Sequence, residues 1–156
     1  MNKRTAAKGA AFAAMAFFSI GSSNAQTIQV EQGYVSGKTA DAVEAFLGLP
    51  YAATTAGDNR WRAPRPAPAW TGVRQATEFG PACQQQLSGE FGPFTNEYLT
   101  HGDVSEDCLS LNIWRPENTP ATAQLPVMVW IHGGGFSSGT TSVPIYDGAP
   151  LARRGI

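Results

Sequence analysis

The chain has 156 residues, of which 42% are hydrophobic and 15% charged, a balance typical of globular proteins rather than disordered ones. Its formal net charge of −1 at pH 7 gives no indication of a nucleic-acid partner or of an anionic membrane surface. Its 17 glycines and 11 prolines predict many turns and loops.

The first 25 residues show the three zones of a secretory signal in the usual order. Two lysines and one arginine form a basic head, and residues 9–20 form an apolar segment that is too short to span a bilayer. Ser23-Asn24-Ala25 then offers small residues at the two positions that a signal peptidase reads. The alternative is a buried N-terminal helix. We expect residues 1–25 to be a cleaved signal peptide of bacterial type, and the mature protein to be periplasmic or secreted, without a membrane span.

The start of the mature chain is predicted to form a small antiparallel sheet. Residues 27–30 and 34–36 have the pattern of a hairpin around a Gln-Gly turn. Residues 42–47 would form a third strand, stopped by the glycine at 48 and the proline at 50. The following stretch, up to residue 70, carries several prolines together with Trp61 and Trp70, so we expect an ordered surface connection pinned by its tryptophans.

Both cysteines, Cys83 and Cys108, lie in the part of the chain that would be exported. In an oxidising compartment they most simply form one disulfide, which would close a long loop and stabilise the fold by roughly 3 kcal/mol. Two free buried thiols are a weaker alternative. Metal binding is weaker still, because His101 and His132 are not at ligand spacing with the cysteines.

The second half of the chain contains two further predicted strands. Apolar and polar residues alternate over residues 109–114, which predicts a half-buried strand, and residues 115–124 read as a turn back. Residues 127–131 are all apolar and three of them are β-branched, so residues 125–131 are predicted to form a central strand buried on both faces. Residues 139–146 are expected to be loop, and residues 148–154 one or two helical turns closed by Gly155.

A run of three glycines, Gly133 to Gly135, follows His132 directly after the predicted central strand. Glycines permit positive φ and lack a Cβ, so the backbone can approach a ligand closely with its N–H groups free. A ligand atom that can use several such donors is an oxyanion, and a tight turn alone would need only one glycine. We therefore interpret this segment as an oxyanion-binding loop of the kind found in lipases and esterases.

Five segments occur together in a diagnostic order. They cover residues 46–52, 60–70, 79–83, 105–114, and 126–139 with 146–148. The Glu-Asp-Cys-Leu-Ser-Leu-Asn stretch that begins at Glu106 is the most specific, and the glycine-rich loop nearly as specific. In these segments the chain resembles type-B carboxylesterases, the cholinesterase-like branch of the α/β-hydrolases, over almost all of residues 29–156.

The resemblance implies an α/β fold, of which this chain would be a truncated N-terminal part: a small antiparallel sheet plus the first strands of the central sheet. Residues 26–156 would be the N-terminal portion of a carboxylesterase domain. The family mechanism uses a serine, an acidic residue and a late histidine, in that order. We expect all three to lie beyond residue 156, since His132 comes too early to be the base. No cofactor or metal is implied.

The resemblance also assigns roles to particular residues. Gly134 and Gly135 match the oxyanion-hole positions, whereas Gly133 serves the turn. Cys83 and Cys108 match the first disulfide of the family. Arg60 and Glu106 match a structural ion pair between the N-terminal loop and the base of that disulfide, the alternative being two solvated charges of little energetic value.

Ser137 lies within a Gly-x-Ser-x-Gly pattern, residues 135–139, that resembles a nucleophile elbow as text. An elbow needs a strand directly before it and a helix directly after it, and neither is predicted here. We therefore expect Ser137 to be a loop serine that holds backbone groups.

Two hypotheses follow for function. The first is an exported serine carboxylesterase acting on small-molecule carboxylic esters, with this chain supplying the oxyanion loop but not the triad. The second is a non-catalytic cholinesterase-like protein that uses the same fold for adhesion or binding. A Gly-x-Ser-x-Gly elbow in the downstream sequence would discriminate between them. A third possibility is that the 156 residues are a complete short product, which is disfavoured because the central strand would lose a neighbour and expose an apolar edge. We expect this chain, expressed alone, not to hydrolyse esters.

Overall fold

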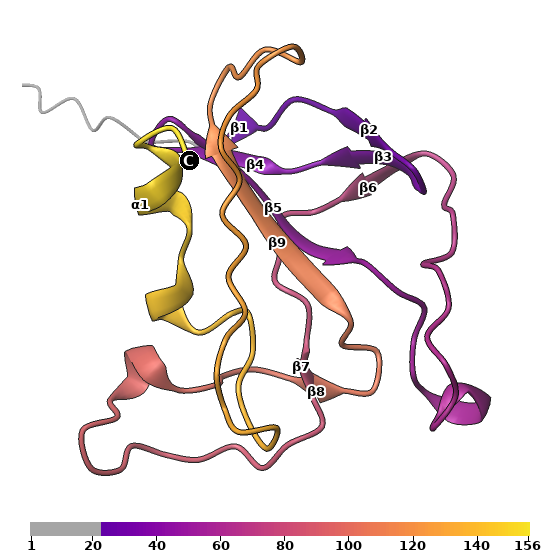
Figure 1. Cartoon of the computed structure of the whole chain (residues 1–156), viewed down its shortest axis with the longest axis vertical. Coiled ribbons are helices and arrows are strands. Elements are labelled where there is room, and N and C mark those ends of the chain that lie inside the picture. Colours follow the sequence, from indigo (N-terminus) through magenta and orange to yellow (C-terminus); the bar gives the residue numbers. More distant parts are fainter. Residues whose placement is uncertain (1–22) are drawn as a thin grey trace, which may run out of the picture.

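The computed structural model describes residues 23–156 (Figure 1). The predicted signal peptide therefore lies outside the described residues, apart from its last three positions. Within these residues, short strands form a four-stranded sheet, a three-stranded sheet and a two-stranded ladder, and long loops connect them to short helical turns.

The larger sheet has four antiparallel strands in the order β1-β4-β5-β9. They are β1 (Ser23–Asn24), β4 (Lys38–Ala40), β5 (Val43–Pro50) and β9 (Ser110–Pro116). The predicted strands over residues 42–47 and 109–114 are thus confirmed in their central parts. β5 and β9 run side by side through the middle of the molecule (Figure 1).

The smaller sheet contains the predicted hairpin and one strand that the sequence pattern did not reveal. β2 (Ile28–Val30) pairs antiparallel with β3 (Gly33–Ser36), which pairs parallel with β6 (Val73–Gln75). Both sheets contribute to one core, which is formed by Ala25, Val35, Phe46, Leu49 and Ala76. The small N-terminal sheet is therefore mixed rather than purely antiparallel, and its predicted third strand, residues 42–47, belongs instead to the larger sheet as part of β5.

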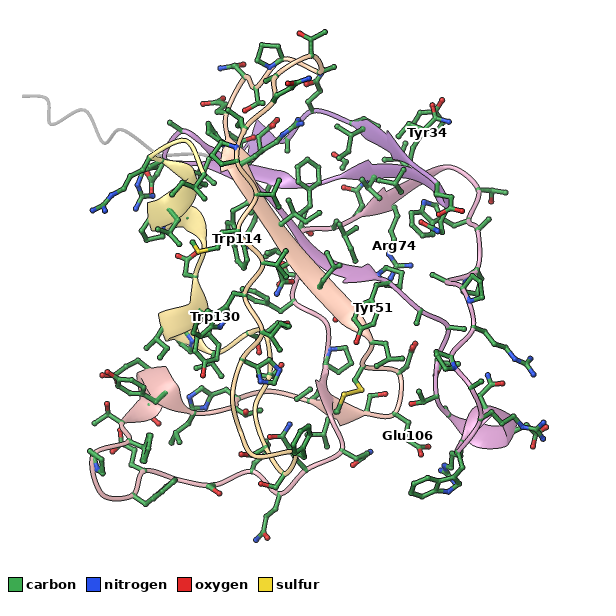
Figure 2. The ribbon with its side chains drawn as sticks, viewed as in Figure 1. Tyr34, Tyr51, Arg74, Glu106, Trp114 and Trp130 are labelled. Carbon is green, nitrogen blue, oxygen red and sulfur yellow. A yellow bond between two sulfur atoms is a disulfide. The ribbon has the colours of Figure 1, made fainter. Side chains whose placement is uncertain are left out.

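The remaining elements are short and belong to the loops. A two-residue parallel ladder joins β7 (Ala82–Cys83) to β8 (Val104–Ser105). Within the described part of the chain, 3₁₀ turns occur at η1 (Gly57–Asn59), η2 (Asn96–Tyr98) and η3 (Pro144–Tyr146), and the predicted helical segment contains α1 (Ala149–Ala152). Figure 2 shows Trp114 between β9 and α1, where a Cβ on Gly148 would lie only 2.6 Å from the Trp114 ring.

The prediction of a buried central strand over residues 125–131 is wrong for this chain. These residues are extended but belong to neither sheet, and Val127, Val129 and Ile131 are 86%, 79% and 85% exposed. In Figure 1 they run down from the top loop to the glycine turn without forming an arrow. The composition favours a strand, but a strand also needs hydrogen-bonding neighbours, and residues 23–156 provide none here.

Two smaller predictions also differ from the structure. Gly48 does not stop β5; it has φ +64 and lies in an irregular part of the β5–β9 pairing, after which the strand continues to Pro50. A β-bulge often contains glycine, so Gly48 bends the strand rather than ending it.

The two tryptophans of the proline-rich connection behave differently from each other. Trp70 anchors the connection by donating its ring N–H to the Tyr34 carbonyl at 2.8 Å, whereas Trp61 is fully exposed and anchors nothing.

Candidate active site

The glycine loop forms a tight turn in which Gly134 can only be glycine. The Gly134 carbonyl accepts hydrogen bonds from the N–H groups of Ser137 and Ser138, at 3.0 and 3.2 Å. Gly134 has φ +123, and a Cβ at this position would lie 1.7 Å from the Ser138 carbonyl oxygen. The backbone of the turn therefore excludes any side chain at this position.

The N–H groups of Gly134 and Gly135 point to no acceptor in the part of the chain that the structure describes. Both residues are exposed, and Gly135 also has positive φ, at +59. Two adjacent donors are therefore available, although residues 23–156 do not enclose the space in front of them. Donors of this kind can stabilise a negative oxygen once water is excluded from the site.

Ser137 uses its hydroxyl to close the same turn. Its Oγ donates to the Gly134 carbonyl at 2.9 Å, next to the hydrogen bond from its own N–H. The segment before it is coil rather than strand, and the residues after it form turns. The local structure is thus that of a loop serine and not that of an elbow.

Two side-chain amides hold the C-terminal arm of the glycine loop. Gln85 accepts the Gly139 N–H at 2.8 Å and donates to the Gly139 carbonyl at 2.9 Å. Asn112 of β9 donates to the Thr141 carbonyl at 3.3 Å and accepts the Gly48 N–H at 2.9 Å. The loop is therefore tied both to the disulfide region and to the main sheet.

The N-terminal arm of the loop is held by an aromatic side chain. The ring of Tyr146, in η3, stacks on His132 with a centroid distance of 6.3 Å and an interplanar angle of 16°. The same ring packs on Trp130 at 5.6 Å. His132 Nδ1 lies 2.8 Å from the Gly133 carbonyl, so the imidazole is engaged with its own backbone.

The structure contains the expected disulfide between Cys83 and Cys108, with a Cα–Cα distance of 5.0 Å; it is the yellow bond in Figure 2. It joins the end of β7 to the residue pair that precedes β9. Within the loop that it closes, Phe91, Phe94 and Tyr98 form an exposed aromatic group, with centroid distances of 5.0 and 6.2 Å.

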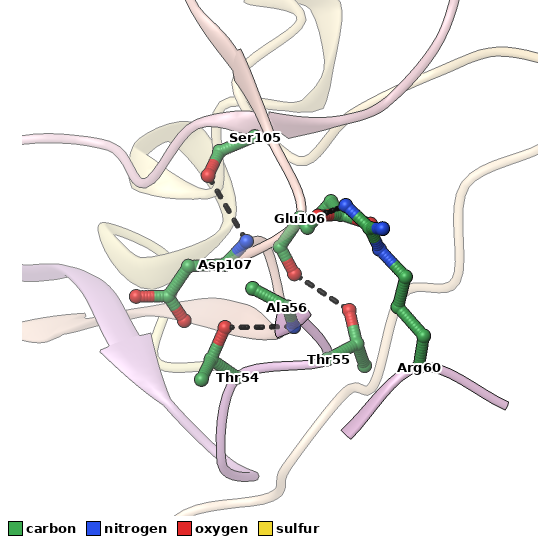
Figure 3. Close-up of polar contacts among 7 residues, drawn as sticks. All are labelled: Thr54, Thr55, Ala56, Arg60, Ser105, Glu106 and Asp107. Atoms are coloured by element: carbon green, nitrogen blue, oxygen red, sulfur yellow. Dashed lines mark hydrogen bonds and ion pairs between the residues drawn. The ribbon is translucent and has the colours of Figure 1, made fainter. Parts of the chain in front are cut away.

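Arg60 and Glu106 form a bidentate ion pair (Figure 3). The Arg60 Nη2 lies 2.5 Å from one carboxylate oxygen, and the Nε binds the other. The hydrogen bonds from the guanidinium, together with its charge, lower the pKa of the Glu106 carboxyl and raise that of Arg60. Thr55 reinforces this junction by donating its hydroxyl to the Glu106 carbonyl at 2.6 Å.

Asp107 makes a local contact beside the disulfide. Its backbone N–H donates to the Ser105 hydroxyl at 3.0 Å (Figure 3). The hydroxyl of Thr54 accepts the Ala56 N–H at 3.2 Å on the facing loop. These turns shape the two loops that Arg60 and Glu106 connect.

A second ion pair, which the sequence analysis missed, lies in the main sheet. Glu44 of β5 is only 3% exposed, and its carboxylate accepts a hydrogen bond from Arg115 of β9 at 2.6 Å. The other oxygen accepts the Gln26 N–H at 2.9 Å. The Arg115 guanidinium also lies 5.5 Å from the Phe46 ring centre. The attraction between the two charges offsets part of the cost of taking the Glu44 carboxylate out of water.

Residues 23–156 contain neither a metal-binding cluster nor a membrane-spanning helix. The structure groups no three His, Cys, Asp or Glu side chains there in a way that could hold a metal ion. Likewise, no helix in this range is long and apolar enough to cross a bilayer.

Comparisons with known proteins place the chain in a family. The model of the carboxylesterase family matches residues 24–156. The chain is 45% identical over 130 residues to fumonisin B1 esterase of Sphingopyxis macrogoltabida, a match that covers 81% of this chain and 22% of that protein. It is 43% identical over 113 residues to mouse cholinesterase, covering 71% of this chain and 18% of the relative.

Two further matches extend the comparison. Phenmedipham hydrolase of Pseudarthrobacter oxydans is 42% identical over 125 residues, covering 79% of this chain and 24% of that protein. A solved PNB esterase superposes with a TM-score of 0.70 at 39% identity, covering 81% of this chain and 25% of the other. The chain thus spans about a quarter or less of the length of these relatives. The fold is the N-terminal part of an α/β-hydrolase, as predicted. By sequence and by structure, the chain belongs to the carboxylesterase family.

Proposed function

We propose that this chain is part of an exported carboxylic ester hydrolase that acts through a serine acyl-enzyme, and that Gly134 and Gly135 supply its oxyanion hole. The observation that carries the proposal is the pair of exposed glycine N–H groups that have no acceptor within residues 23–156. The relatives named as esterases or hydrolases support the reaction class.

In this mechanism, a serine hydroxyl outside residues 1–156 attacks the ester carbonyl, and a histidine accepts its proton. The carbonyl oxygen becomes negatively charged, and the two glycine N–H groups donate to it. Loss of one such donor typically raises the barrier by about 3 kcal/mol. The alcohol leaves with a proton from the histidine, and water then releases the acid from the acyl-enzyme. The step needs neither metal nor cofactor.

We further propose that residues 125–131 become a buried strand of the sheet in the longer protein. Val127, Val129 and Ile131 are exposed here, and Leu111 and Ile113 on β9 are 36% and 44% exposed. Apolar surface of this extent is stabilised when other elements cover it. A fixed strand would also aim the glycine loop that follows it.

The domain and export assignments stay part of the same proposal: a signal peptide over residues 1–25, and a portion of one carboxylesterase domain over residues 26–156. The disulfide supports export, because such bridges persist in oxidising compartments. The proposed substrates are small carboxylic esters.

The test uses the full-length protein that contains this chain. We expect turnover of a p-nitrophenyl ester, and a covalent adduct of an organophosphate on one serine located beyond residue 156 by mass spectrometry. The Ser137→Ala variant serves as the control and should keep its activity. A well-folded protein with no turnover and no adduct would favour the non-catalytic alternative, and an adduct on Ser137 would overturn the assignment of the triad to later residues.

A further inference from the structure

The side chain of Gln85 holds the glycine loop through two hydrogen bonds, one to the N–H and one to the carbonyl of Gly139. Its Oε1 accepts the Gly139 N–H at 2.8 Å, and its Nε2 donates to the Gly139 carbonyl at 2.9 Å. The same Nε2 donates to the Cys83 carbonyl at 3.0 Å, which fixes the orientation of the side chain. A carboxamide is required for this arrangement, because it presents a donor and an acceptor side by side.

Gly139 is also the point where the two arms of the loop meet. It has φ +110, and a Cβ there would lie 2.7 Å from His132 Nδ1 and 2.9 Å from the Gly133 carbonyl oxygen. Gly139 therefore packs directly against the residues that enter the loop. Holding Gly139 in place consequently fixes both ends of the segment that carries the Gly134 and Gly135 N–H groups.

The neighbouring glutamines make no comparable contact. Gln84 and Gln86 are exposed, and neither side chain forms a hydrogen bond within the described part of the chain, whereas Gln85 is half-buried. Of these three consecutive glutamines, only Gln85 binds the loop. Gln86 can therefore serve as a matched control for substitutions of Gln85.

We propose that Gln85 is a positioning residue for the oxyanion hole, acting through Gly139 on the Gly134 and Gly135 N–H groups. This inference rests on the proposed function. Oxyanion stabilisation depends on donors being fixed before the charge develops, and a misplacement of about 1 Å can reduce a rate about a hundredfold. Gln85 touches no reacting atom in this proposal; it sets where the donors lie.

The test compares Gln85→Met, Gln85→Glu and Gln86→Glu in the full-length enzyme. Methionine keeps the approximate length but removes both hydrogen bonds, and glutamate keeps only the acceptor. We expect Gln85→Met to lower kcat for a p-nitrophenyl ester by about tenfold to a hundredfold with little change in KM, because the loss falls on the transition state. Gln86→Glu should behave like the wild type.

Two readouts separate positioning from a general structural effect. A trifluoromethyl ketone forms a tetrahedral oxyanion in the active site, so its affinity should fall by about the same factor as kcat/KM in Gln85→Met. In Gln85→Glu, a protonated carboxyl can again donate and accept. The activity of this variant relative to the wild type should therefore rise as the pH is lowered from about 8 to about 5, since two carbonyl oxygens favour the protonated form.

The outcomes distinguish this inference from the function on which it rests. A wild-type enzyme without turnover would overturn both. An active wild type whose Gln85→Met variant keeps its kcat would overturn only the role of Gln85. A Gln85→Met variant that loses thermal stability and kcat, but binds the ketone as tightly as the wild type, would also overturn it.

Discussion

Arg60 and Glu106 lie 46 positions apart in the sequence and meet through two hydrogen bonds, which tie the loop after β5 to the base of the disulfide. The Arg60 side chain is 58% exposed to solvent, and the Glu106 side chain is 29% exposed. We therefore expect the pair to contribute little energy. Its main effect is to fix the position of one loop relative to the other, because no strand pairing joins them.

The contribution of this pair to stability should depend on pH. The pKa of Glu106 is lowered from its ordinary value of 4.5 in the folded chain, so the pair stabilises the fold above that pH. The contribution is lost as the pH falls through the lowered pKa. We expect Glu106→Gln to melt at a lower temperature than the wild type at pH 7, and the difference to disappear in strong acid. Glu117→Gln, on an exposed turn, is the control; an equal difference at all pH values would contradict this explanation.

Removing one partner of the buried Glu44–Arg115 pair should greatly lower the stability of the protein, and removing the second partner as well should restore most of it. Glu44→Ala leaves the Arg115 guanidinium without its partner and the Gln26 N–H without its acceptor, and we expect a loss of about 3 kcal/mol in urea unfolding. Adding Arg115→Met removes the orphaned charge, so the double variant should recover most of that loss. A double variant that is less stable than Glu44→Ala would show that the guanidinium stabilises the sheet by other contacts.

The space available for a side chain differs between Gly133 and Gly134, so alanine substitutions at the two positions should have different effects on activity. In Gly134→Ala the new Cβ would lie 1.7 Å from the Ser138 carbonyl oxygen, so the turn must open. No atom lies within 4 Å of a Cβ at Gly133. We expect Gly134→Ala to lower kcat about a hundredfold and Gly133→Ala to have a mild effect, measured with the same ester. Equal activity of the two variants would contradict the placement of the oxyanion hole.

The proposed strand over residues 125–131 can be tested by adding a charge. Val129 is 79% exposed here, but in the full-length protein we propose that it is buried. Val129→Lys should then abolish soluble expression or lower stability by about 3 kcal/mol or more. Leu87→Lys is the control, because Leu87 is 45% exposed in the disulfide loop. A stable, active Val129→Lys enzyme would show that the segment stays at the surface.

The sequence correctly predicted the strands that depend on the pattern of residues within the segment itself. The hairpin of β2 and β3 follows from alternation around a Gln-Gly turn, and the interior of β9 follows from the alternation over residues 109–114. Composition also predicted a strand over residues 125–131. Periodicity reports what a segment prefers, however, and cannot show whether a neighbouring strand is present to pair with it.

The contacts that escaped prediction depend on how distant segments align. Glu44 and Arg115 are 71 positions apart and become neighbours only because the β5–β9 register places them directly opposite each other. Gln85 is one of three consecutive glutamines, and nothing in its type separates it from Gln84 and Gln86. Its role appears only when the folded loop brings Gly139 within hydrogen-bond distance.

The short distance along the chain between Cys83 and Gln85 has a practical consequence. Gln85, which binds Gly139, lies two residues after a covalent crosslink, so we expect cleavage of that crosslink with dithiothreitol to loosen the segment that carries Gln85. Purification buffers for this protein should therefore contain no thiol reagent, and recombinant production should target an oxidising host compartment.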